Sequence, residues 1–240
     1  MQTKKSQESQ RLINSVKEFF NQTKELSSRR EEIEQGLSEV EQAFVKKLPT
    51  SSYLLDIGCA TGRLCLALAQ RGYTVTGVDV AEKQIQQAQT IAKKEQIDVT
   101  FLHYEPPTLP FPDASFAAAF LIRTYCYVPY RAARIAFLEE IARVLTPDGF
   151  LLMSQQILDP FTDAYEPTYD ENYHQAASGY ETLEAGDNFS TGITSYVHYF
   201  LEADLKAELE ESPFQLIESS AKREILSCVL RKHRTDPKLS

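Results

Sequence analysis

Hydrophobic residues in this chain follow two patterns that alternate from about residue 53 onward. Short apolar runs typical of buried strands occur at YLLDI, TVTGVDV, VTFLH, SFAAAFLI and FLLMSQQ. Between them, apolar residues recur every three or four positions, which predicts helices from about Thr61, from Ala81 to about Glu95, and over RAARIAFLEEIARVL. This alternation predicts βαβ units and a parallel sheet, with right-handed crossovers that place helices on both faces.

Both ends of the chain depart from this alternation. Residues 8–48 have helical spacing, which predicts an N-terminal helical extension over 1–50 ahead of a domain over 51–240. The extension either covers the sheet or an edge of the site, or serves as an arm for a partner or a second copy of the chain. Residues 159–195 are rich in Asp, Glu, Tyr, Pro and Gly and predict an insertion or lid. The strands FQLIESS and EILSCVL are close enough in sequence to pair antiparallel.

Composition and charge narrow the function classes. The chain has 240 residues, of which 42% are hydrophobic, as is typical of one globular domain. Its net charge of −9 hides two basic ends and a strongly acidic body, which disfavours nucleic acid as a partner. No apolar run approaches the roughly 20 residues that cross a bilayer, so we expect a cytoplasmic protein without a membrane partner. The four cysteines show no C-x-x-C spacing, which predicts reduced thiols and no metal site.

The most informative segment is LLDIGCATGR, Leu54–Arg63, where an apolar strand runs into a turn of small residues and then a helix. In open α/β sheets, ligands bind at the carboxyl ends of strands, where small residues let the backbone approach them. A dinucleotide motif would need glycine at Ala60 and Arg63, and a P-loop would need glycine and then lysine from position 63. Instead, Asp56 precedes the turn and Asp79 ends the next strand, which favours a nucleoside with an ammonium group and no phosphates.

These motifs resemble those of a known family. LLDIGCATGR followed by VTGVDVAEKQIQQA resembles the first two motifs of the class I S-adenosylmethionine-dependent methyltransferases. YEPPTLPFPDASFAAAF and FLEEIARVLTPDGFLLMS resemble the later strands of that family, so the resemblance covers residues 53–155 well and 198–230 loosely. It implies a Rossmann-like α/β fold with a doubly wound, mostly parallel seven-stranded sheet and an antiparallel last strand. The implied cofactor is S-adenosyl-L-methionine, with S-adenosyl-L-homocysteine as the product.

The resemblance also implies which residues hold the cofactor. The turn lies against its amino-acid part, with Asp56 as the orienting acid, and Asp79 takes the ribose hydroxyls. Val80 packs on adenine and Glu105 reaches the adenine amino group. The full implied set is Asp56, Gly58, Cys59, Ala60, Gly62, Arg63, Asp79, Val80, Glu105 and Arg123. Replacing Asp79 with alanine is therefore expected to weaken cofactor binding and to leave the fold intact.

Three departures from the family pattern bear on the chemistry. Ala60 stands where a middle glycine is usual, and we expect the turn to tolerate it with a negative φ. Ala117 stands where many relatives have aspartate, and Cys126 and Tyr127 where some have a histidine pair. These changes leave it open whether the loop supplies a general base. If the acceptor needs one, the candidates by location are His198, His103, Glu105 and Tyr125.

The acceptor side is expected in the loop 123–127 and in the lid. Candidate catalytic residues are Arg123, Tyr125, Tyr127 and His198. Arg123 either binds a carboxylate or phosphate of the acceptor or pairs with a structural acid. The tyrosines either line an aromatic pocket or wall the fold. The aromatic lid residues, which could close over a cationic or aromatic acceptor, are Tyr165, Tyr169, Tyr173, His174 and Tyr180.

Three functions follow from these observations. The first is methyl transfer to an unidentified small molecule, by in-line displacement at an aligned sulfonium. The second is methylation of RNA or protein, with the basic ends as the docking patch. The third is a non-catalytic cofactor-binding interaction protein. Oligomers, if formed, are expected through the N-terminal helices.

Overall fold

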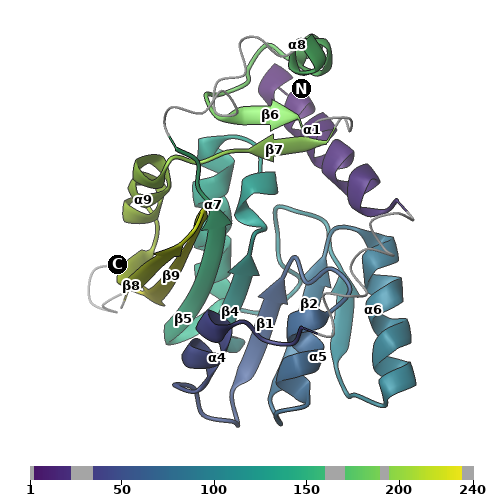
Figure 1. The fold of residues 1–240 in the computed structure, drawn as a ribbon, viewed down its shortest axis with the longest axis vertical. Helices are drawn as coiled ribbons and strands as arrows, with labels where there is room; N and C mark the ends of the chain where they lie inside the picture. Colours follow the sequence, from purple (N-terminus) through teal and green to yellow (C-terminus); the bar gives the residue numbers. More distant parts are fainter. Residues whose placement is uncertain (1–2, 23–34, 160–170, 190–194, 234–240) are drawn as a thin grey trace.

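A sheet of seven strands, in the order β3-β2-β1-β4-β5-β9-β8, forms the centre of the computed structural model (Figure 1). The model describes residues 3–22, 35–159, 171–189 and 195–233. The strands are β1 (Tyr53–Ile57), β2 (Thr74–Asp79), β3 (Thr100–His103), β4 (Phe116–Ile122), β5 (Leu145–Gln156), β8 (Phe214–Lys222) and β9 (Ile225–Lys232). Strands β1 to β5 pair in parallel, whereas β9 is antiparallel to both β5 and β8. The predicted fold class is therefore confirmed.

Helices cover both faces of the sheet. One face carries α4 (Glu39–Val45), α5 (Arg63–Ala69) and α6 (Glu82–Glu95), and the other carries α7 (Arg131–Val144) and α9 (Glu202–Glu210). Neighbouring residues of one strand enter different cores, because side chains alternate across a strand. Leu54 packs with α4 and α5, whereas Leu55 packs with α7. Burial on both faces explains why the strands are continuous apolar runs.

The additions to this sheet lie beyond the carboxyl ends of its parallel strands (Figure 1). They are α1 (Lys4–Phe20), α8 (Glu171–Ala177) and a two-stranded sheet of β6 (Asp187–Phe189) and β7 (Tyr196–His198). Leu12 and Val16 of α1 pack with Phe189 and Tyr196 of that small sheet in a third hydrophobic cluster. The apolar face of α1 is thus buried against its own chain.

Several sequence expectations change in detail. The small sheet has no counterpart in the predicted elements. Strand β5 begins at Leu145, so it includes the TPDG segment that reads as a turn. Within the predicted insertion, α8 and β6 are described, whereas Tyr165 and Tyr169 of the proposed lid lie outside the described residues. The predicted boundary at residue 50 and an oligomer through the N-terminal helices stay predictions.

Two further features concern membrane-spanning helices and disulfides. Of the described helices, none combines the length and the apolar character needed to cross a membrane. The four cysteines are free and buried, and none forms a disulfide. The reduced state of these thiols stays a prediction.

Candidate functional site

A cavity of about 330 Å³ lies beyond the carboxyl ends of β1, β2, β4 and β5. It is at the point where the strand order reverses between β1 and β4, which is where open α/β sheets bind ligands. The sheet side is lined by Gly58, Ala60, Asp79, Val80, Gln84, Tyr104, Ile122, Arg123, Thr124, Cys126, Tyr127, Gln155 and Gln156. The other side is lined by Val16, Phe19, Phe20, Ser195, Tyr196, Val197 and Tyr199.

The turn after β1 needs its first glycine because the loop after β4 approaches it closely. Gly58 has φ +75°, and a Cβ there would lie 2.2 Å from Oγ1 of Thr124. The N–H groups of Gly58 and Cys59 donate to the carbonyl oxygen of Val78, at 2.8 and 3.0 Å. The turn is therefore tied to β2 on one side and pressed against the loop after β4 on the other, with its backbone open to the cavity.

Asp79 holds the middle of this turn as well as facing the cavity. Its Oδ2 accepts the N–H of Ala60 at 2.9 Å, and its Oδ1 accepts the N–H of Ala81 at 2.8 Å. Ala60 has φ +48°, so the expectation of a negative φ is wrong. The left-handed conformation costs an L-residue roughly 1–2 kcal/mol, and the hydrogen bond to Asp79 helps to offset that cost.

Asp56 lies beneath the turn, on a smaller cavity of about 60 Å³ that Gly58, Arg63 and Arg123 also line. Burial raises the pKa of its carboxyl from 3.8 to about 7, although the Cys65 thiol donates to Oδ2 at 3.3 Å and opposes that rise. Burial likewise raises the pKa of Cys59 to about 11. A thiol that stays protonated is a poor nucleophile, so Cys59 packs rather than reacts.

Two residues of the implied cofactor set are engaged elsewhere. The guanidinium of Arg63 makes two hydrogen bonds to Glu41 of α4, at 2.6 and 2.8 Å, and so joins α5 to α4. Glu105 is exposed and pairs with Lys17 of α1. Its neighbour Tyr104, rather than Glu105 itself, lines the cavity.

Arg123 and Tyr127 line the cavity, but Tyr125 does not. Arg123 is exposed and has no acidic side-chain partner within the described ranges. Tyr125 is fully buried, stacks on Phe200 and donates its hydroxyl to Glu208 at 2.9 Å. Burial raises the pKa of Tyr125, so its hydroxyl stays protonated.

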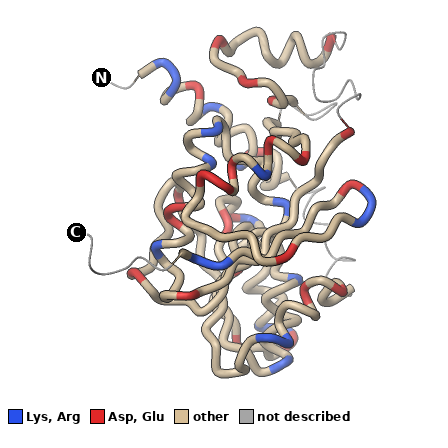
Figure 2. The backbone as a smooth tube through the Cα atoms, turned by 90° about the vertical axis from the view of Figure 1, so that its left-hand side faces the viewer, with Lys and Arg blue, Asp and Glu red and all other residues tan. Residues whose placement is uncertain are grey.

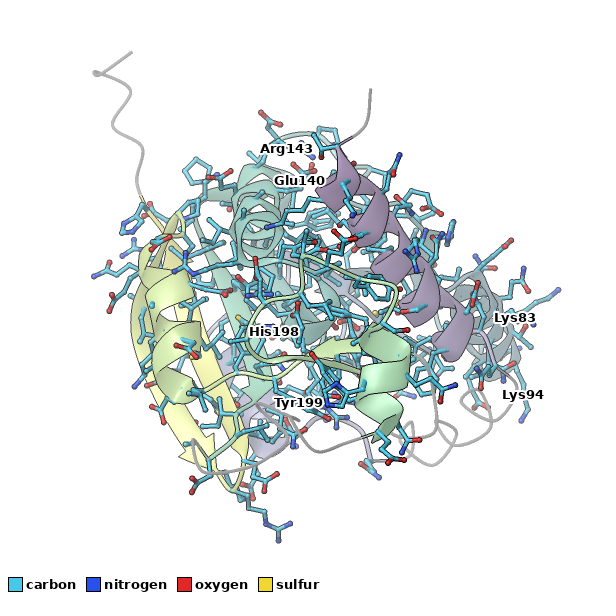
Figure 3. The ribbon with its side chains drawn as sticks, turned by 90° about the horizontal axis from the view of Figure 1, so that it is seen from above. Lys83, Lys94, Glu140, Arg143, His198 and Tyr199 are labelled. Atoms are coloured by element: carbon cyan, nitrogen blue, oxygen red, sulfur yellow. The ribbon has the colours of Figure 1, made fainter. Side chains whose placement is uncertain are left out.

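His198 is also withheld from the cavity. It lies at the end of β7 near the middle of the molecule seen from above, next to Tyr199, which does line the cavity (Figure 3). Its Nδ1 is 2.7 Å from Oδ1 of Asp187, and the same oxygen accepts the hydroxyl of Tyr196 at 2.7 Å. The structure therefore places this histidine in a buried structural network.

Two polar residues that sequence analysis missed have atoms left over. Oε1 of Gln84 and Oγ of Ser195 are buried, line the cavity and have no hydrogen-bond partner in the described part of the chain. Buried polar atoms are almost always paired, so these two indicate a ligand. One signal was present in the sequence: Gln84 is a polar residue directly before Ile85, in the buried stripe of its helix.

Helix α1 forms the roof of the cavity through Val16, Phe19 and Phe20. The C-terminal end of α1 is fixed to the sheet domain, because the carbonyl oxygen of Phe20 accepts from Nε2 of Gln84 at 2.8 Å. The N-terminal half of α1 is fixed by Glu8, whose buried carboxylate accepts the N–H and the hydroxyl of Thr182, at 3.2 and 2.5 Å. A bound molecule would thus be enclosed between the sheet and α1.

Known proteins resemble the central part of this chain. Residues 54–149 match a family model described as a methyltransferase domain. The chain is 36% identical, over 110 residues, to the 27-O-demethylrifamycin SV methyltransferase of Amycolatopsis mediterranei, a match that covers 45% of this chain and 39% of that protein. The chain therefore spans less than half the length of this curated relative.

Solved structures share the fold. A SAM-dependent methyltransferase from Methanosarcina mazei superposes with a TM-score of 0.69 at 23% identity, covering 83% of this chain and 99% of that one. The Burkholderia thailandensis 1,6-didemethyltoxoflavin-N1-methyltransferase, crystallised with 1,6-didemethyltoxoflavin and S-adenosylhomocysteine, superposes with a TM-score of 0.59 at 19% identity, covering 80% and 75%. At these identities the likeness establishes the architecture alone.

Proposed function

We propose that this chain is a class I S-adenosylmethionine-dependent methyltransferase, which transfers a methyl group from S-adenosylmethionine to a small molecule in the cavity described above. One observation carries the proposal. The same roofed cavity has the glycine turn and Asp79 on one side and aromatic residues such as Phe20 and Tyr199 on the other. It therefore offers separate walls for a nucleoside and for an acceptor.

The residues present fit the cofactor. The Asp79 carboxylate is an acceptor for ribose hydroxyls, and Val80 and Tyr104 give an apolar wall for the base. Oε1 of Gln84 is a buried acceptor that lacks a donor within the described residues. A nucleoside would supply such a donor. Asp56 lines the adjoining small cavity together with Gly58 and is the acid expected to face an ammonium group.

S-adenosylmethionine supplies a methyl group on a sulfonium, which is already activated for transfer. The task left to the protein is alignment, which contributes up to roughly 7–11 kcal/mol in well-oriented reactions. The roof of α1 and the turn at Gly58 would hold donor and acceptor between them. Since Tyr125 and His198 point into buried networks, we propose that the acceptor atom is nucleophilic without proton removal by either residue.

Two observations favour a small molecule over a polymer as the acceptor. The cavity is about 330 Å³ and lies under α1, a size that suits a small molecule. In the view of Figure 2, Lys and Arg are interspersed with Asp and Glu along the described backbone, and the net charge of −9 would repel a phosphate backbone. Relatives named for small-molecule acceptors agree with this choice.

The four free thiols favour a reducing compartment, and we propose the cytoplasm.

Calorimetric titration tests the cofactor. We expect S-adenosylmethionine and S-adenosylhomocysteine to bind in the micromolar range and NAD not to bind. Gly58→Ala should abolish binding because its Cβ would meet Thr124. Gly72→Ala is the matched control, since Gly72 also has positive φ but its Cβ would meet nothing within 4 Å. Failure of both S-adenosyl compounds to bind would contradict the proposal, and binding without turnover over a broad acceptor panel would favour the non-catalytic alternative.

A further inference from the structure

A second, larger groove of about 670 Å³ lies on the other side of Arg123. It is bounded by the start of α4, by the start of α5 and by the hairpin between β8 and β9. Ile122 and Arg123 line both this groove and the cavity beneath α1. The two spaces therefore meet at the carboxyl end of β4, where the acceptor is proposed to lie.

The floor of the groove is a row of hydroxyl groups. Ile122 of β4 pairs in register with Ser154 of β5, Ser154 with Ser227 of β9, and Ser227 with Ser220 of β8. Residues in register on neighbouring strands point to the same face of a sheet, so the three serines lie side by side. All three line the groove. Small polar side chains here leave the sheet face open where larger apolar ones would fill it.

Positive charge is concentrated around that row, although the chain as a whole carries −9. The groove is lined by Arg63, Arg123, Lys222 and Arg223, against a single acid, Glu41. Glu41 is occupied by Arg63, and Lys222 pairs with the exposed Glu39 at 3.0 Å. Within the described residues, the guanidinium groups of Arg123 and Arg223 have no carboxylate partner.

We propose that this groove binds a carboxylate or phosphate group of the molecule whose reacting atom lies in the cavity. Guanidinium groups bind both kinds of oxyanion through paired N–H groups, and serine hydroxyls add further donors. An anion bridging Arg123 and the hairpin would anchor one end of the acceptor outside the cavity. This inference rests on the proposed methyl transfer for the identity of the molecule, but not for the presence of the anion site.

The test is a titration of the full chain with inorganic pyrophosphate and, separately, with citrate, at constant ionic strength and followed by amide NMR signals. We expect the signals of Ser154, Ser227 and Arg223 to shift. Arg223→Gln should lower the affinity for whichever anion binds better by about tenfold or more, which is the effect of losing one charged hydrogen bond. Arg71→Gln, which removes an exposed arginine that follows α5 and lies outside the groove, should leave the affinity unchanged.

The outcomes separate the two proposals. Equal weakening in Arg71→Gln, or groove signals that do not move with either anion, would overturn the anion site. A parallel titration with S-adenosylmethionine reports on the cofactor through the signals of Ala60 and Ala81. If those signals move and the groove signals do not move with either anion, the cofactor site stands and the groove proposal fails. If the reverse holds, the anion site stands without the transfer reaction. A response to pyrophosphate alone assigns a phosphate, and a response to citrate alone assigns a carboxylate.

Discussion

Replacing Asp79 with alanine should damage the cofactor turn itself. The side chain accepts two backbone N–H groups, from Ala60 at 2.9 Å and from Ala81 at 2.8 Å. Ala81 is fully buried, so its N–H would lose its acceptor without gaining water. An unsatisfied buried donor costs about 1–3 kcal/mol. Ala60 is partly exposed, and water can satisfy its N–H, but nothing would then hold its φ of +48°.

We therefore expect Asp79→Ala to lower the free energy of unfolding by about 2–4 kcal/mol. This replaces the expectation from sequence that only a ribose contact is lost. Affinity for S-adenosylhomocysteine should fall as well, because the loosened turn and the missing carboxylate act together. The free energy of unfolding of Asp79→Asn should lie between those of the unmodified chain and Asp79→Ala, since the amide oxygen can accept one N–H while the NH₂ group cannot accept the other.

The assay is urea denaturation followed by far-UV circular dichroism, because the chain has no tryptophan. Calorimetric titration with S-adenosylhomocysteine accompanies it. Asp113→Ala is the control, since that exposed carboxylate pairs with Arg143 at 2.8 Å and should cost no more than about 1 kcal/mol. If Asp79→Ala were as stable as Asp113→Ala and bound the cofactor product normally, the supporting role of Asp79 would be refuted.

Three further predictions concern the turn, the roof and the buried acid. Ala60→Gly should raise the free energy of unfolding by about 0.5–1 kcal/mol in the same assay, because it relieves a left-handed φ, and a loss of stability would contradict the strain. Glu8→Ala should speed hydrogen exchange across α1 by removing the acceptor of Thr182, whereas Glu18→Ala, exposed on the same helix, should not; equal rates would remove Glu8 as the anchor. The Asp56 carboxyl has a pKa raised from 3.8 to about 7 by burial, so its contribution to stability is lost as pH rises through that window. The stability of Asp56→Asn relative to the unmodified chain should therefore increase from about pH 4 to about pH 7 in urea denaturation, and a constant difference would show that Asp56 does not titrate there.

The sheet could be predicted because its signals are local. A strand buried on both faces, such as Tyr53–Ile57, is a short apolar run whatever its neighbours are. The acids at Asp56 and Asp79 end successive strands, so the topology alone brings them to one edge. The φ of Ala60 could not be predicted, because it depends on a hydrogen bond that its N–H donates to Asp79, 19 residues later in the chain.

The rest of the site depends on contacts between distant parts of the chain. In the sequence, Glu8 is one more polar residue of an amphipathic helix. Its anchoring role depends on Thr182, 174 residues away, which donates to it. His198 resembles a catalytic base by location, and only its pairing with Asp187 withdraws it from the cavity. The small sheet escaped prediction because each of its strands is only three residues long, which is too short to show a period.

The roofed cavity is built from two kinds of segment. Residues 54–149, which match the family model, include Gly58 and Asp79, whereas Phe20 and Tyr199 on the opposite wall lie outside that match. Substitutions in the outer segments can reshape the space left for an acceptor while the cofactor turn stays as it is. A library confined to α1 and to residues 195–199 is thus the natural starting point for redirecting the proposed methyl transfer to new acceptors.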